Sequence, residues 1–279
     1  MTDLLVDAAW LASHRDDVVV ADVRWSAAAG TAEAERAFES GHIPGAVLFD
    51  VDRDLAGEPF VEGPGRHPLP TADRFAETLA ARGIGPGDRV VCYDDAGGSV
   101  AARLWWMLDA IGRSCALLDG GLRAWPGPLE TGPASHPSGP TEPAVRPWPA
   151  DRLVEVAGVA EALRAGEVVL DARVAERYRG ETEPIDPVAG HIPGARSAPF
   201  PDVLRADGTF RSAEELRELF RILGVHDDTA PIAYCGSGVT ASLDVFALRL
   251  AGFHARLYEG SWSDWVHDPS RPVRTGAEP

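Results

Sequence analysis

The sequence has few cysteines, no long apolar run and no start typical of a secretion signal. Three cysteines in 279 residues are too few for a disulfide framework, and no CxxC pair indicates a metal site. No apolar run approaches the ~20 residues that a membrane-spanning helix requires. The first residues, MTDLLVDAAWLASHRDD, lack basic side chains at the start and soon turn acidic. We therefore expect a cytoplasmic protein, in a reducing compartment where a cysteine can be kept as a free thiol.

Positive charge is also scarce. The chain carries 43 acidic residues against 26 basic ones, a formal net charge of −17. Nucleic acids and anionic membranes are held mainly through Lys and Arg, so this balance argues against both as partners. A small anionic substrate would need a local basic pocket that opposes the overall field.

The sequence repeats itself, which predicts a duplicated domain. Four blocks recur in the same order, at offsets of 149 residues for the first two and 141 and 140 for the last two. They are DVR (22–24) with DAR (171–173), GHIPGA at both 41–46 and 190–195, VVCYD (90–94) with PIAYC (231–235), and DGGLRAW (119–125) with EGSWSDW (259–265). Between the halves, residues 126–149 are rich in Pro and Gly and show no periodicity. We expect a first domain over residues 1–135, a linker over 136–150 and a second domain over 151–279.

Within each half, short apolar runs alternate with amphipathic stretches. Predicted strands include 18–24, 46–49, 89–94 and 115–119 in the first half, and VVLDAR, PIAYC and ARLYEG in the second. Predicted helices include TADRFAETLAARG and SVAARLWWMLDAIG, then SAEELRELFRILG and VTASLDVFALRLAG. This alternation predicts an α/β fold, in which each half is a doubly wound, mainly parallel sheet flanked by helices. Active sites in such sheets lie beyond the carboxyl ends of the strands.

Cys235 lies where such a strand meets a Gly-containing loop and then a helix. Consecutive N–H groups of such a junction point into one concavity, and with the helix N-terminus they stabilise a thiolate or a persulfide anion. Gly236 and Gly238 let the loop curl tightly. Cys92 and Cys115 lie inside apolar strands, where a buried and inert thiol is expected. In the first half Asp94 takes the place of Cys235, which makes that domain the non-catalytic one.

The repeated GHIPGA blocks, the cysteine loop and the closing YEGSWSDW resemble tandem-domain rhodanese sulfurtransferases along essentially the whole chain. The resemblance implies two rhodanese-like domains and a Cys235 persulfide. The loop CGSGVTA (235–241) resembles that of 3-mercaptopyruvate sulfurtransferases, and the resemblance makes Gly236, Gly238, Val239 and Thr240 substrate-binding candidates. Thiosulfate-preferring relatives have basic residues directly after the cysteine, where this chain has Gly236 and Ser237.

The two donors require different side chains. Thiosulfate is a dianion whose leaving group, sulfite, needs no proton, and a basic loop suits it. When mercaptopyruvate gives up its sulfur, the remaining fragment is a pyruvate enolate that must be protonated. This requires a correctly positioned proton donor. The resemblance implies a relay like that of serine proteases, from Asp52 through His67 to Ser237. The alternative is that His67 is an ordinary loop histidine and Asp52 a turn residue.

Arginine suits a substrate carboxylate, because its planar guanidinium can bind both oxygens. Arg177 matches the substrate-binding arginine of the family, and Arg179 is a nearby candidate. The second arginine typical of mercaptopyruvate enzymes falls at Asp186 here, where thiosulfate-type relatives can have an acid. A solvated surface position is the alternative for both arginines.

Other recurring residues are expected to be structural. His42 and His191 recur inside GHIPGA in both halves, including the half without the cysteine, and so indicate a turn. Asp22 and Asp171 are each followed two residues later by Arg, which predicts buried ion pairs. Trp262 and Trp265 are expected to pack in the core.

The resulting hypothesis is a sulfurtransferase that passes sulfur from 3-mercaptopyruvate through Cys235 to a thiol, such as thioredoxin or a low-molecular-weight thiol, or to cyanide. It needs no metal and no organic cofactor. Thiosulfate:cyanide sulfurtransferase is the first alternative. A persulfide carrier without efficient turnover is the second.

Overall fold

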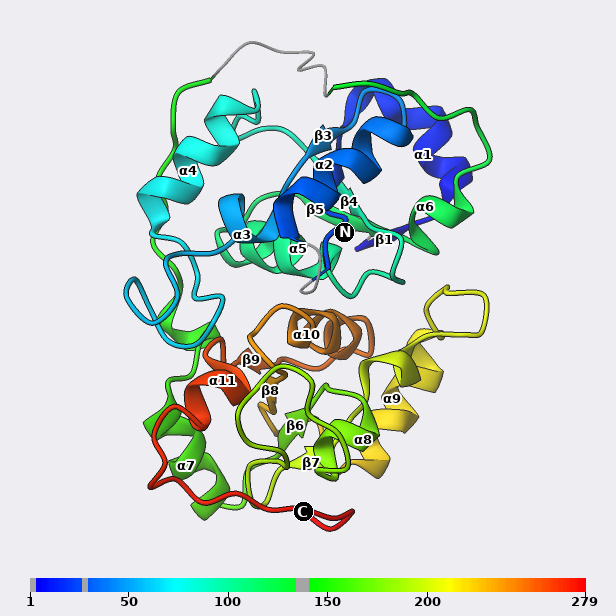
Figure 1. The fold of residues 1–279 in the computed structure, drawn as a ribbon. Helices are drawn as coiled ribbons and strands as arrows, with labels where there is room; N and C mark the ends of the chain where they lie inside the picture. Colours follow the sequence, from blue (N-terminus) through cyan, green and yellow to red (C-terminus); the bar gives the residue numbers. More distant parts are fainter. Residues whose placement is uncertain (1–3, 27–29, 134–140) are drawn as a thin grey trace. The chain divides into compact units, whose positions relative to one another are not determined.

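The computed structural model describes residues 4–26, 30–133 and 141–279, and it divides into two compact units (Figure 1). The first contains the chain up to Gly57, then Pro70–Trp148 and Ala206–Thr209; the second contains Glu58–Leu69, Pro149–Arg205 and Phe210–Pro279. Residues 58–69 therefore belong to the second unit, although they lie in the first half of the sequence. Of the predicted linker, residues 136–140 lie outside the described residues.

Each unit is built on a parallel sheet, and the two sheets share one strand order. In the first unit the order is β1-β5-β4-β2-β3, from Leu5–Val6, Cys115–Leu118, Val90–Tyr93, Val19–Asp22 and Val47–Leu48. In the second it is β9-β8-β6-β7, from Arg256–Leu257, Ile232–Tyr234, Val169–Asp171 and Arg196–Ser197. Leu153 pairs with Leu257 as an isolated parallel bridge, in the place that β1 has in the first sheet. The predicted pair of parallel α/β domains is confirmed.

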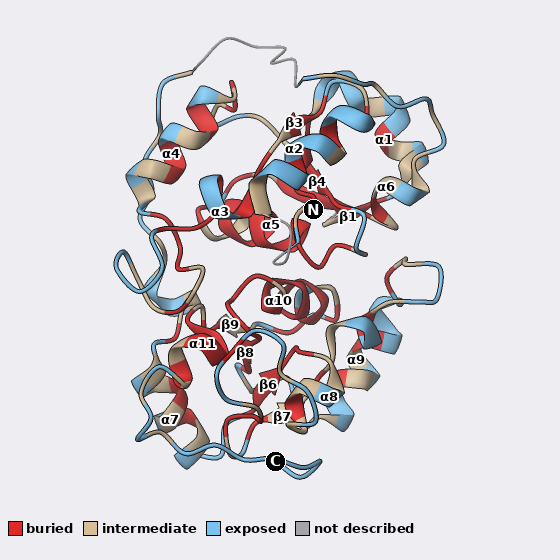
Figure 2. Ribbon diagram, in the orientation of Figure 1, coloured by how far each residue is buried: buried red, intermediate tan, exposed pale blue. Residues whose placement is uncertain are grey.

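Helices cover both faces of each sheet. In the first unit, α1 and α2 pack on one face and α5 contacts the other; in the second, α7 and α11 pack on one face and α10 contacts the other. Figure 2 shows α5 and α10 buried along most of their length, as expected for helices that are apolar nearly all round. The helices are α1 Ala8–His14, α2 Gly30–Ser40, α3 Val51–Asp54, α4 Ala72–Ala81, α5 Ala101–Ala110, α6 Gly121–Ala124, α7 Val156–Arg164, α8 Ala175–Tyr178, α9 Ala213–Ile222, α10 Ala241–Leu250 and α11 Ser261–Trp265. None of those described is long and apolar enough to cross a membrane.

A buried ion pair holds the GHIPGA turn to the end of β2 in the first unit. Arg24 Nη2 lies 2.8 Å from Asp22 Oδ2 and also donates to the carbonyl oxygen of Gly41 at 2.8 Å. The hydroxyl of Tyr93 donates to Asp22 at 2.6 Å and accepts from the N–H of Ile43 at 3.1 Å. The aspartate at the end of β2 therefore organises the turn that follows the next helix, α2.

The second unit repeats this arrangement at the end of β6. Arg173 Nη2 donates to Asp171 Oδ2 at 2.6 Å and to the carbonyl oxygen of Gly190 at 2.7 Å. The hydroxyl of Tyr234 accepts from Ile192 N at 3.2 Å. Both ion pairs are buried, as the sequence predicted.

The two histidines of the GHIPGA turns are buried, and each is bonded to a helix that precedes its turn. His42 Nδ1 lies 2.8 Å from Phe38 O, and His191 Nδ1 lies 2.8 Å from Tyr178 O. Each ring also stacks on the aromatic ring of the same partner residue. Burial lowers the pKa of His191, which favours the neutral ring. These contacts agree with the structural role that the repetition predicted.

Asp94, at the end of β4, is the first-unit counterpart of Cys235. Its carboxylate is fully buried and accepts N–H bonds of 2.7–2.8 Å from Ala96, Gly98, Val100 and Ala101. Burial raises the pKa of Asp94, although the four N–H groups act in the opposite direction. The strand–loop–helix junction of this fold can thus surround an anion with its own backbone.

Asp94→Ala should destabilise the first unit by about 2–4 kcal/mol. The substitution leaves buried N–H groups without acceptors, each at a cost of ~1–3 kcal/mol, and water entering the space offsets part of it. Chemical denaturation measures the change. The control is Asp95→Ala, next to it but exposed, which should stay within ~0.5 kcal/mol of the wild type. Equal losses in both variants would show that the N–H bonds to Asp94 are not needed.

Candidate active site

Cys235 directly follows β8 and is held from two sides. Its N–H donates to Ser261 Oγ at 3.1 Å, and its carbonyl oxygen accepts from Trp262 N at 3.0 Å. These bonds fix the cysteine between the end of the strand and α11. The residue is 3% exposed, which keeps the thiol largely away from solvent.

The glycines of the loop allow two close approaches. Gly238 has φ +78°, and a Cβ there would collide with the carbonyl oxygen of Glu259. A Cβ on Gly236 would lie 3.3 Å from Arg66 Nη2 and 3.4 Å from Arg177 Nη1. Two guanidinium groups therefore lie against the residue that follows the cysteine. Val239 and Thr240 complete the loop and lead directly into α10.

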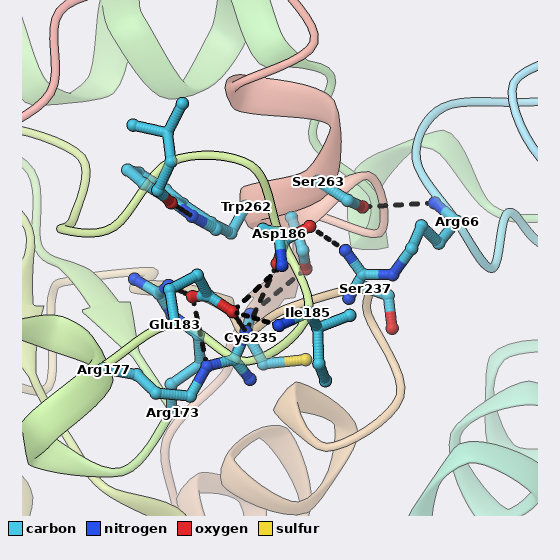
Figure 3. A network of polar contacts seen from close by, with 12 residues as sticks. Arg66, Arg173, Arg177, Glu183, Ile185, Asp186, Cys235, Ser237, Trp262 and Ser263 are labelled. Atoms are coloured by element: carbon cyan, nitrogen blue, oxygen red, sulfur yellow. Dashed lines mark hydrogen bonds and ion pairs between the residues drawn. The ribbon is translucent and has the colours of Figure 1, made fainter. Parts of the chain in front are cut away.

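Arg66 and Arg177 share one carboxylate. Arg66, from the segment 58–69, donates through Nη1 to Asp186 Oδ1, and Arg177 Nη2 lies 3.2 Å from Asp186 Oδ2. Figure 3 shows Asp186 between the two guanidinium groups, which approach it from opposite sides. The Asp186 side chain is only 2% exposed. The acid at the position where mercaptopyruvate enzymes have a second arginine thus holds two arginines from different segments.

A second carboxylate connects this pair to the buried core of the unit. Glu183 accepts from Arg177 Nη2 at 2.6 Å and from Arg173 Nη1 at 3.3 Å (Figure 3). Arg173 is the arginine that pairs with Asp171 at the end of β6. An unbroken series of alternating charges therefore runs from Asp171 to Arg66.

The charges of this network shift the pKa values of its arginines. Burial lowers the pKa of Arg66; negative charge on Cys235 opposes the shift, and the like charge of Arg177 adds to it. Burial also acts to lower the pKa of Arg173, but Asp171 and Glu183 outweigh it, and the net change is upward. Arginine stays protonated at neutral pH in either case, so each of these arginines keeps its positive charge.

Ser237 and His67 are in direct contact. His67 Nδ1 lies 2.7 Å from Ser237 Oγ, and both residues belong to the second unit. The histidine loop is fixed on both sides, since Arg66 N donates to Ser263 Oγ at 3.1 Å and Leu69 N donates to Glu259 Oε2 at 2.9 Å. A hydroxyl group supported by an imidazole therefore lies two residues after the cysteine. This is an arrangement suited to proton transfer.

Two other predicted site residues lie elsewhere in the chain. Asp52 belongs to α3 of the first unit, where Trp25 Nε1 donates to its Oδ2 at 2.9 Å. Arg179, just after α8, pairs with Glu181 at 2.7 Å and with Glu176 at 3.7 Å, both of them exposed. The bonds described for Arg179 thus point it to the surface of the helix end rather than into the network around Cys235.

Sequence reasoning missed Arg66 and Glu183 and assigned no contact to Asp186. Arg66 directly precedes His67, so its place in a candidate loop was a signal that could have found it. Its pairing with Asp186, 120 positions along the chain, had no local signal. Trp262 and Trp265 pack in the core as expected, and Cys92 and Cys115 are buried in β4 and β5. Within the described ranges, no three His, Cys, Asp or Glu side chains come together in a way that could hold a metal ion.

Gly238→Ala should destabilise the second unit and reduce the reactivity of Cys235. A suitable control is Gly166→Ala, because Gly166 has the same φ of +78° but nothing within 4 Å of the added carbon. We expect the control to lose ~1–2 kcal/mol from backbone strain alone. Gly238→Ala should lose a further ~1–3 kcal/mol through the collision with Glu259. Denaturation curves and the rate of Cys235 alkylation measure both effects, and equal losses would refute the close approach.

Comparisons with known proteins agree with the duplication and with the fold. The model of the Rhodanese-like domain matches twice, over residues 6–127 and 155–268. A Pseudomonas aeruginosa protein, provisionally named as a 3-mercaptopyruvate sulfurtransferase, is 45% identical over 269 residues, or 93% of each chain. A Mycobacterium tuberculosis protein, provisionally named as the thiosulfate sulfurtransferase SseB, is 41% identical over 281 residues, or 98% of this chain and 97% of the other. The solved structure of 3-mercaptopyruvate sulfurtransferase SseA from Escherichia coli matches with a TM-score of 0.79 and 33% identity, covering 94% of this chain and all of the other. The chain belongs to the rhodanese family, as a sulfurtransferase with two rhodanese-like domains.

Proposed function

We propose that this sulfurtransferase takes its sulfur from 3-mercaptopyruvate and carries it on Cys235 as a persulfide. The contact between Ser237 Oγ and His67 Nδ1 is the observation that carries the proposal. It provides a proton-transferring group beside the nucleophile. Of the two donors considered, only mercaptopyruvate leaves a fragment that must be protonated.

The first step uses the thiolate of Cys235 as the nucleophile and the thiol proton of the donor as the proton source. Cys235 Sγ attacks the donor sulfur, the carbon–sulfur bond breaks, and its electron pair stays on carbon as a pyruvate enolate. The proton released from the donor thiol is delivered to that carbon through Ser237 and His67, which gives pyruvate. Arg177 binds the donor carboxylate, and the N–H groups of the 235–241 loop stabilise the persulfide anion, as the corresponding loop does for Asp94.

In the second step an acceptor thiolate attacks the outer sulfur, and the Cys235 thiolate leaves. We propose a small-molecule thiol, thioredoxin or cyanide as the acceptor, and the cytoplasm as the compartment, because reduced thiols are abundant there. Asp52 is the proposed third member of the relay, orienting His67. Arg179 is a secondary candidate for contact with the donor.

Thiosulfate is the second candidate donor. It is favoured by the similarity to the Mycobacterium tuberculosis protein, which is provisionally named as a thiosulfate sulfurtransferase. Against it, the loop CGSGVTA contains no basic residue to match a dianion. Steady-state kcat/KM for both donors, with wild type and Cys235→Ser, separates the two functions from each other and from a carrier that does not turn over.

Treatment with the donor should add one sulfur atom, on the peptide that contains Cys235. Mass spectrometry of the digested protein gives the mass and the site. Cys92 and Cys115 serve as internal controls because both are buried in strands, and burial raises the pKa of the Cys92 thiol well above its usual value. Sulfur found on either of these residues but not on Cys235 would overturn the assignment.

Ser237→Ala should slow mercaptopyruvate turnover by ~10²–10⁴-fold, the usual contribution of acid–base catalysis. Thiosulfate turnover should change little, because sulfite leaves without a proton. The control is Ser270→Ala, an exposed serine of the same unit, which should leave both reactions unchanged. A loss of equal size with both donors would mean that Ser237 shapes the loop and transfers no proton.

A further inference from the structure

We propose that Asp186 sets the charge selectivity of the donor site, by bridging Arg66 and Arg177 and cancelling one of their two charges beside Cys235. The site then favours a donor with one negative charge over a dianion. This inference deepens the proposed function and depends on it for the identity of the donor. Its test is chosen so that the two can fail separately.

The geometry places both arginines where a donor must bind. Their guanidinium groups lie 3.3–3.5 Å from the Cβ position of Gly236, the residue that follows the cysteine. Their side chains are 24% and 15% exposed, so each retains access to a small ligand. The chain contains no lysine, and two of its 26 arginines lie beside the cysteine loop.

The charges of the network cancel before any donor binds. Arg66, Arg173 and Arg177 face Asp171, Glu183 and Asp186, three positive charges against three negative ones. Asp171 pairs with Arg173 in the interior, and Glu183 joins Arg173 to Arg177. Asp186 instead bridges Arg66 and Arg177, the two arginines nearest the cysteine (Figure 3). Asp186 is thus the carboxylate whose charge an entering anion meets most directly.

The effect on a ligand grows with the charge of the ligand. Removing one negative charge a few ångströms away, in a partly solvated site, should strengthen the binding of an anion roughly tenfold per ligand charge. Without the charge of Asp186, a monoanion such as mercaptopyruvate should bind roughly tenfold more tightly. The dianion thiosulfate should bind roughly a hundredfold more tightly. The presence of Asp186 therefore lowers the relative preference for thiosulfate roughly tenfold.

A purely structural role of Asp186 predicts something else. If the acid only keeps the two arginines in place, its loss should weaken every anionic ligand. The charge of the ligand separates the two roles, because only the electrostatic role strengthens anion binding when the acid is removed. The measurement must therefore compare a charged and an uncharged ligand at the same sulfur.

Alkylation of Cys235 by iodoacetate and by iodoacetamide provides this comparison without any sulfur donor. The two reagents have similar size and need the same thiolate, so the ratio of their rates cancels changes in thiol ionisation. Mass spectrometry of the Cys235 peptide gives both rates. In Asp186→Asn the iodoacetate-to-iodoacetamide ratio should rise roughly tenfold. The matched control is Glu181→Gln, the same loss of charge on an exposed acid of the same segment, which should leave the ratio unchanged.

Arg66→Gln gives an independent arm should Asp186→Asn fold poorly. Its ratio should fall roughly tenfold, because Asp186 remains while one guanidinium is lost. In the donor reactions, Asp186→Asn should raise kcat/KM for thiosulfate about tenfold more than for mercaptopyruvate, mainly through KM. An unchanged or lowered alkylation ratio in Asp186→Asn, or an unchanged ratio in Arg66→Gln, overturns the inference. If the ratios shift as expected but wild type does not use mercaptopyruvate, the charge selectivity stands and the proposed donor is wrong.

Discussion

The site depends on one buried series of ion pairs that begins at the end of β6. Asp171 binds Arg173, Glu183 joins Arg173 to Arg177, and Asp186 joins Arg177 to Arg66. Glu183 and Asp186 each bind two guanidinium groups, and Asp171 binds the guanidinium and the backbone N–H of Arg173. These bonds offset the cost of burying the charges. Removing one member of a buried pair leaves its partner charged and unsatisfied, which typically costs ~3–5 kcal/mol. The position of the arginines beside Cys235 is therefore fixed from the sheet outward.

The two halves show how one ancestral arrangement serves two purposes. In both, an Asp–Arg pair at the end of β2 or β6 and a tyrosine from the neighbouring strand hold the GHIPGA turn. In the first half, N–H groups of the loop after β4 donate to the carboxylate of Asp94, at the start of the same loop. In the second half Cys235 replaces that carboxylate. The shared scaffold accounts for stability, and under the proposed function the exchange of one side chain makes the same kind of loop available to a reactive sulfur.

The sequence was enough to predict what the repeat and the strand pattern encode. The duplication, the parallel sheets, the buried Asp–Arg pairs and the structural role of His42 and His191 follow from local patterns that recur in both halves. The pairing of Arg66 with Asp186 could not be predicted in this way, because neither residue has a counterpart in the repeat and they are far apart in the chain. Likewise, the inclusion of residues 58–69 in the second unit depends on tertiary contacts such as Leu69 to Glu259 and Arg66 to Ser263. Local sequence propensity cannot predict contacts between residues so far apart in the chain.

The same contacts constrain how the position of residue 186 can vary. An arginine there, as the family resemblance describes for mercaptopyruvate enzymes, would place a third guanidinium against Arg66 and Arg177 with only Glu183 left to balance them. Like charges at this distance repel strongly in a partly buried site. A change of Asp186 to arginine is therefore compatible with this site only if Arg66 is lost at the same time. Here Arg66 and Arg177 supply two guanidinium groups that share the carboxylate of Asp186. In a chain without Arg66, an arginine at position 186 would supply the second guanidinium beside Arg177, both from a single segment. The charge that meets the donor differs by one between these solutions, although the number of arginines beside the cysteine is the same.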